Sequence, residues 1–166
     1  MLYTAGLSTL DAAADAVEEA CRSFPAKPDM VLFFSDGERF CDFSEALHRR
    51  YPMSAVVGAS TYASFSAQGM CRRGLNVTAF SGGIHVRAGL VRGITRSPGM
   101  IYQDIVQDAL TSLPAPAAEN NTCCFLLNPA GTASEEAVLD MLDEALSGTG
   151  IPVFGGSASS EVCARG

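Results

Sequence analysis

The spacing of apolar side chains predicts alternating helices and strands in the first half of the chain. Apolar residues recur every three or four positions from Ser8 to Phe24, which predicts an amphipathic helix. Residues 30–34 form a short, wholly apolar run bounded by turn residues, which is typical of a buried strand. A second helix is expected over residues 40–50 and a second buried strand over residues 53–59.

Residues 75–81 and 84–91 predict a pair of antiparallel strands. Gly82-Gly83 between them has the length and residue type of a tight hairpin turn. Strands that alternate with helices predict an α/β fold. Because the hairpin adds antiparallel pairing, we expect a layered domain with a mixed, mostly parallel β-sheet and flanking helices.

The last third of the chain predicts a further series of helices and strands. Ser97-Pro98 is a typical helix start, with a capping hydroxyl before a proline in the first helical position. Residues 123–127 are an apolar run that predicts a third buried strand. Thr132 and Glu135 have capping-box spacing for another helix, and a short strand over residues 152–154 then enters a glycine- and serine-rich end.

Length and charge narrow the classes of function. The 166 residues are enough for one domain with its own core, so we expect residues 1–166 to form a single domain. The formal net charge is −7 and Lys27 is the only lysine, which disfavours binding to nucleic acid or to an anionic membrane surface. No apolar run approaches the roughly 18 residues of a membrane helix, and the N-terminus does not resemble a signal peptide. A cytoplasmic location is therefore predicted.

Side chains that could carry catalysis are few and scattered. His48 and His85 have no second histidine or cysteine at metal-ligand spacing, and none of the six cysteines belongs to a Cys-x-x-Cys pair. The sequence contains neither a nucleophile elbow nor a phosphate-binding loop. We therefore expect no metal, no cofactor and no enzymatic activity. The alternative, a hydrolase or transferase that uses Cys71 or Ser60, lacks a visible general base.

Four predicted strand ends carry glycine, serine or asparagine, and they are Ser35–Gly37, Gly58–Thr61, Asn128–Gly131 and Gly155–Ser157. Open α/β sheets bind ligands beyond the carboxyl ends of their parallel strands, so these four segments are expected to lie along one edge. Backbone N–H groups exposed by glycine, together with short hydroxyls, suit a small polar or anionic ligand. An ordinary turn without a ligand is the alternative for each segment. The predicted ligand-binding residues are Ser35, Ser60, Thr61, Tyr62, Asn128, Gly155, Gly156 and Ser157.

The order of these segments resembles the N-terminal domain of the FIST family. The resemblance rests on Pro28–Ser35, Ala55–Thr61, the hairpin, and a last strand-helix-strand unit that ends in Pro152–Ala158, and it covers about residues 5–160. FIST domains are described as intracellular signal-transduction domains that sense small ligands such as amino acids. The resemblance therefore implies an amino-acid-like or carboxylate ligand.

The sequence departs from the family pattern at the second motif. The family's Gly-Cys-Ser-Thr-Ala-Gly-Glu stretch corresponds here to Gly58–Ser64, with Ala59 in place of the cysteine and Ala63-Ser64 in place of Gly-Glu. A ligand contact made by that glutamate in relatives would be missing here. Family members also carry a C-terminal FIST portion, and some are joined to signalling modules. The resemblance implies that such a portion or module is a partner of this domain.

Two classes of function remain open on the sequence. The first is a ligand-sensing domain for signal transduction, and the second is a protein-interaction or assembly module without a small ligand. The last predicted strand, residues 152–154, leaves a sheet edge uncovered, and such an edge offers unpaired N–H and C=O groups to another copy. Self-association, for example as a homodimer, or marginal stability is therefore expected.

Overall fold

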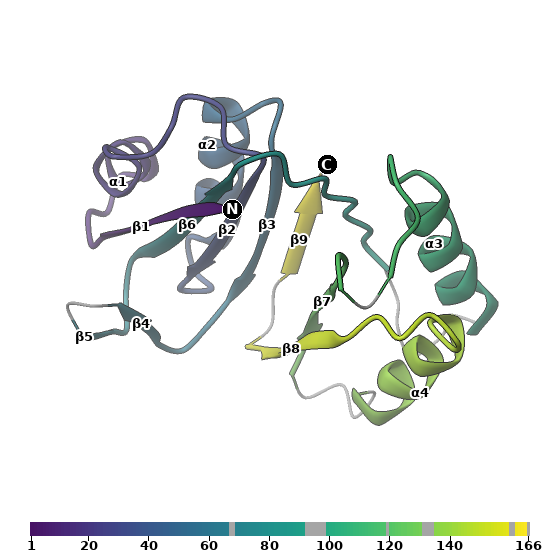
Figure 1. Cartoon of the computed structure of the whole chain (residues 1–166). Coiled ribbons are helices and arrows are strands. Elements are labelled where there is room, and N and C mark those ends of the chain that lie inside the picture. The colour runs from purple at the N-terminus through teal and green to yellow at the C-terminus, as the bar shows by residue number, and fades with distance from the viewer. Residues whose placement is uncertain (67–68, 92–98, 119, 131–134, 160–161, 166) are drawn as a thin grey trace.

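A five-stranded mixed sheet forms the larger part of the fold (Figure 1). The computed structural model describes residues 1–66, 69–91, 99–118, 120–130, 135–159 and 162–165. In sheet order, the strands are β1 (Leu2–Ser8), β6 (Leu75–Ser81), β2 (Met30–Ser35), β3 (Ala55–Ser60) and β9 (Val162–Arg165). Strands β2 and β3 are parallel, whereas β6 runs antiparallel to both of its neighbours and β9 runs antiparallel to β3.

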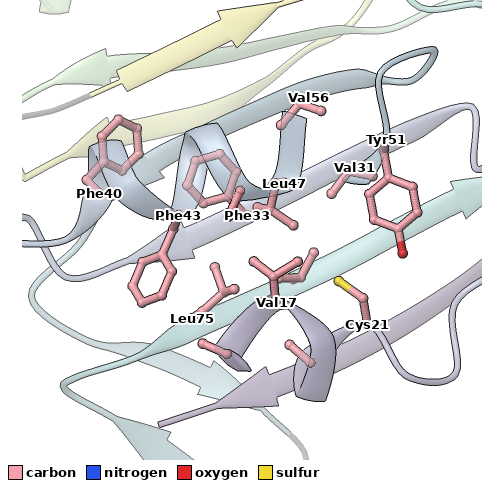
Figure 2. Close-up of a cluster of buried hydrophobic side chains, with 14 residues drawn as sticks. Val17, Cys21, Val31, Phe33, Phe40, Phe43, Leu47, Tyr51, Val56 and Leu75 are labelled. Carbon is pink, nitrogen blue, oxygen red and sulfur yellow. The ribbon is translucent and has the colours of Figure 1, made fainter. Parts of the chain in front are cut away.

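Two helices cover one face of this sheet and enclose the main core. These helices are α1 (Ala13–Ala20) and α2 (Phe40–Arg50). Alternation along β2 and β6 buries Phe33 and Val77 beneath them, because successive side chains of a strand point to opposite faces. Figure 2 shows Phe33 within this cluster, where its ring stacks on Phe40 with 5.3 Å between the centroids. A fully buried side chain of this kind stabilises the fold by about 1.5–3 kcal/mol.

The close contact between α1 and β1 depends on Gly6. A Cβ atom at this position would collide with the carbonyl oxygen of Ala20. Ser8, the last residue of β1, strengthens the same contact, since its hydroxyl donates to Glu19 Oε2 at 2.6 Å. The predicted helix from Ser8 to Phe24 is therefore wrong at both ends: its first residue belongs to a strand that the sequence pattern did not reveal, and the helix ends at Ala20.

The second part of the fold is a two-stranded parallel sheet with two helices against it (Figure 1). Strand β7 (Cys124–Pro129) pairs with β8 (Val153–Ala158), and α3 (Gly99–Thr111) packs against α4 (Glu135–Ala145). The core of this part is small. It contains the buried side chains Tyr102, Val138 and Leu142, against which Leu126 of β7 packs.

A short hairpin connects β3 to β6, and Asp36 holds the end of β2 to the start of β6. The hairpin consists of β4 (Ser64–Ser66) and β5 (Gly69–Cys71). Asp36, directly after β2, accepts a hydrogen bond from the N–H of Gly74 at 3.0 Å and pairs with Arg39 at 2.7 Å. Burial alone would raise the pKa of Asp36, but the hydrogen bonds from Arg39 and Gly74 and the charge of Arg39 outweigh it, so the pKa lies below its usual value.

The predicted hairpin at Gly82-Gly83 is wrong. Residues 84–91 are not a strand, because both edges of β6 are already occupied by β1 and β2. The chain instead turns away at Asp29, whose carboxylate accepts hydrogen bonds from the N–H groups of Gly83 at 3.0 Å and Ile84 at 3.1 Å. The glycine pair forms a turn as expected, but the antiparallel partner of β6 comes from the N-terminus.

The α/β fold with a mixed sheet is confirmed, with two differences from the expected arrangement. Parallel pairing within the described residues is confined to β2–β3 and β7–β8, so the sheets are less parallel than predicted. The last expected strand, over residues 152–154, extends to Ala158, and β9 follows it and covers the edge of β3. The predicted helix starts at Ser97-Pro98 and Thr132 lie outside the described residues.

Candidate functional site

The two sheets approach each other where β3 and β8 end. The N–H of Ser159, one residue beyond β8, donates to the carbonyl oxygen of Ser60 at 2.9 Å. The two side-chain hydroxyls are also hydrogen-bonded, with 2.8 Å between the oxygens. On the other side of β3, the N–H of Thr61 donates to the carbonyl oxygen of Ser35 at 2.8 Å. The end of β3 thus joins the large sheet to the small one.

A cavity of about 320 Å³ lies beside this junction. Its volume falls at the lower end of the range for small-molecule sites. Residues from β2, β3, β7 and β8 contribute to it, so both sheets form its walls. The lining residues are Phe34, Ser60, Thr61, Phe125, Leu127, Gly155, Gly156, Ser157 and Ala158.

Five of the eight residues predicted from the sequence line this cavity. They share a small size, and they are Ser60, Thr61, Gly155, Gly156 and Ser157. Ser60 and Thr61 lie at the end of β3, whereas residues 155–157, expected in a turn after the last strand, lie within β8. Their convergence follows from the contact between the ends of β3 and β8, which bridges two sheets rather than following one edge of a single sheet. Their role in ligand binding remains a prediction.

The other three predicted residues lie outside the lining. Ser35 is buried and is in register with Ser60, and its side-chain hydroxyl donates to the carbonyl oxygen of Asp36 at 3.2 Å. Tyr62 is 86% exposed and does not belong to the lining. Asn128 is buried on β7, two positions after Leu126, and therefore on the face of β7 that packs toward the helices.

Sequence reasoning missed the apolar walls of the cavity. Phe34, Phe125 and Leu127 belong to runs that the sequence marked only as buried strands. Phe34 lies on the sheet face opposite Phe33, and Phe125 is 43% exposed. The alternation of these aromatic residues with core residues could have indicated that they lie on the other face of their strands. Only the position of the second sheet shows that the rings of Phe34 and Phe125 border one cavity.

Two consecutive glycines give β8 its form at the cavity. Gly155 has a φ of 143°, and a Cβ atom there would collide with the backbone of Leu126, so glycine allows β8 to pair closely with β7. Gly156 differs, because a Cβ atom there would meet nothing within 4 Å. Gly156 therefore leaves open space where a side chain would otherwise enter the cavity.

None of the described lining residues carries a charge, an imidazole or a thiol. Ser60 has the hydroxyl of Ser159 as a hydrogen-bond partner, and no acid or base borders it within this lining. Cys71 lies on β5, where its thiol donates to the carbonyl oxygen of Arg73 at 2.7 Å. Across the described ranges, no group of three or more His, Cys, Asp or Glu side chains is arranged to hold a metal ion.

The fold makes this protein an α/β domain with a cavity between its two sheets. A comparison of the sequence with protein families then identifies the family. The model of the FIST N domain matches residues 29–165. The chain belongs to the FIST N-domain family, a family of sensory domains in signal transduction. No curated protein matches the sequence. Among the described residues, no helix is long and apolar enough to cross a membrane.

Proposed function

We propose that this domain senses a small metabolite, which binds in the cavity between β3 and β8. One observation carries the proposal: the lining combines strand residues from both sheets, so a bound molecule would contact both parts of the fold. Binding would stabilise the contact between the parts and would report occupancy to a C-terminal FIST portion or a signalling module. The family also supports a cytoplasmic location and an amino-acid-like or carboxylate ligand as the first compounds to test.

The test is a thermal-shift screen of the whole chain against amino acids, carboxylates, amides and alcohols. A ligand at 100 times its dissociation constant should add about 2.7 kcal/mol to the free energy of unfolding. For a domain of this size, we expect an upward shift of several degrees in the melting temperature. A panel in which no compound shifts the melting temperature would contradict the proposal.

An assembly function is the second candidate, and the exposed edge strand β1 favours it. Leu2 and Tyr3 on this strand are 75% and 72% exposed, and among the described strands β1 pairs with β6 alone. Large apolar side chains at an unpaired strand edge are typical of a surface that pairs with another chain. Sedimentation across a concentration series tests this candidate. A Leu2→Lys/Tyr3→Lys variant should remain monomeric where the original chain dimerises.

A further inference from the structure

The walls of the cavity are suited to a flat apolar group. Phe34 comes from β2, whereas Phe125 and Leu127 come from β7, so apolar side chains from both sheets border the space. Gly156 adds no side chain between them. Aromatic side chains gain about 0.5–1.5 kcal/mol from pairing with another ring beyond the burial of area. A planar ring is therefore a better fit than a small, fully polar molecule.

The polar groups of the cavity are hydroxyls. Ser60 and Thr61 each bring a hydroxyl group to the lining, and a hydroxyl both donates and accepts hydrogen bonds. Ser157 also belongs to the lining, but it is in register with Asn128, so its side chain lies on the face of β8 opposite Gly156. Thr61 already donates to the carbonyl oxygen of Ala63 at 2.7 Å and accepts from the N–H of Ala63 at 3.3 Å, which leaves its hydroxyl one further lone pair. These groups match a head group that itself donates and accepts, such as an amide or an alcohol.

Support for a carboxylate is weak at this site. The N–H groups of Thr61 and Ser159 are already bonded to carbonyl oxygens of Ser35 and Ser60. No lysine, arginine or histidine is among the described lining residues, and the whole chain carries a formal net charge of −7. An anion that leaves water needs a cation or several free N–H donors, and without them the neutral form is favoured.

We propose that the ligand is a neutral molecule with an aromatic or similarly flat apolar body and an amide or hydroxyl head group. This inference rests on the proposed function, since it assumes that the cavity binds a ligand. It narrows the class of ligand and replaces the carboxylate that the family resemblance implied.

Benzamide and benzoate provide a matched pair of probes. They share the ring and differ in head group, since benzoate is ionised at neutral pH and benzamide is neutral. We expect ligand-observed NMR titrations of the whole chain to show benzamide binding about tenfold or more tightly than benzoate, because an unpaired carboxylate loses its hydration without compensation.

Two variants connect this binding to the cavity. Gly156→Val places a side chain in the open space, where its Cβ atom meets no heavy atom within 4 Å, and Phe125→Ala removes one wall. Both should abolish benzamide binding. Phe154→Ala is the control, because Phe154 is in register with Phe125 and is 57% exposed but does not line the cavity, so binding should be retained. An unchanged circular dichroism spectrum of each variant confirms that it folds. If Gly156→Val does not fold, Phe125→Ala still tests the inference.

The outcomes separate this inference from the proposed function. Benzamide binding that is lost in the two cavity variants and kept in Phe154→Ala supports the inference. If benzoate or an amino acid binds in the cavity as tightly as benzamide or more tightly, the neutral-ligand inference is overturned while the sensing function stands. If no neutral or charged compound binds, both proposals are overturned. Benzamide binding that survives in both cavity variants places it elsewhere and also overturns the inference.

Discussion

The two parts of this domain differ in how they are stabilised. In the five-stranded sheet and its two helices, Phe33, Phe43 and Leu47 are among many side chains without solvent exposure. Among the fully buried large side chains of the described residues, Val138 is the one that comes from the part containing β7 and β8. That part also exposes large apolar side chains, such as Leu139 and Phe154. A well-packed half and a sparsely packed half thus border one cavity.

This difference suggests a division of roles. Regions with few buried apolar contacts open at a lower free energy than the global unfolding reaction. The part that contains β7 and β8 should therefore open first, and ligand binding should stabilise it most. The large sheet, in contrast, supplies a rigid edge at Ser60 against which the smaller sheet is held.

The largest expected effect comes from truncating the main core. Phe33→Ala should lower the free energy of unfolding by about 3–5 kcal/mol, because it leaves a cavity beneath both helices. Leu142→Ala in the small core should cost about 2 kcal/mol, at the low end for such a change, since fewer buried neighbours surround it. Urea denaturation measures both, and hydrogen exchange should show β7 and β8 exchanging before β2 and β3. Equal losses of unfolding free energy in the two variants, with simultaneous hydrogen exchange of both sheets, would show that the domain unfolds as one cooperative unit. That result would contradict the difference in stability between the two parts.

The ion pair of Asp36 should make the large sheet sensitive to acid. Asp36→Asn is expected to cost about 1.5–3 kcal/mol near neutral pH, because it removes a charged partner of Arg39, which also pairs with Asp11, and weakens the hydrogen bond to Gly74. The pKa of Asp36 is lowered in the folded state, so its contribution is present above the unfolded pKa of about 4 and is lost as the pH falls below it. Denaturation curves between neutral and acidic pH should converge for the original chain and the variant.

Glu38→Gln is the matched control for that experiment. Glu38 pairs with Arg73 at 2.8 Å, but both side chains are largely exposed to solvent. An exposed pair of this kind contributes about 0–1 kcal/mol. A cost for Glu38→Gln as large as that for Asp36→Asn would refute the assignment of the acid sensitivity to the partly buried pair of Asp36 and Arg39.

The smallest predicted effect compares one buried tyrosine from each part. The Tyr51 hydroxyl in the main core accepts a hydrogen bond from Arg50 Nε at 3.1 Å, so Tyr51→Phe should cost about 0.5–1.5 kcal/mol. The Tyr102 hydroxyl in the small core is buried and has no partner among the described residues, so Tyr102→Phe should be neutral or slightly stabilising. Melting temperatures of the two variants measure the difference. A destabilised Tyr102→Phe protein would indicate a contact of this hydroxyl that the described structure does not contain.

Much of the candidate site could be anticipated from short stretches of sequence. Ser60, Thr61 and Gly155–Ser157 are small residues that follow apolar runs, and this pattern is recognisable without a structure. The expected turn was wrong for Gly155–Ser157, which lie within β8. The aromatic walls were not recognisable, because Phe34 and Phe125 read as ordinary strand residues. Tyr62 shows the opposite error, since its place beside Ser60 and Thr61 in the sequence did not bring it to the cavity.

The helices and most strands of this protein follow from the sequence because their signals are local. A stripe of apolar side chains at helical spacing, or a short apolar run between turn residues, requires no knowledge of distant segments. Strand pairing is different, because each strand has two edges and the partner depends on which edges are free. Residues 2–8 therefore pair with β6 at the edge where the sequence predicted residues 84–91. The cavity depends on the same kind of long-range choice, since Ser60 and Ser159, whose hydroxyls join its two sides, are 99 positions apart in the chain.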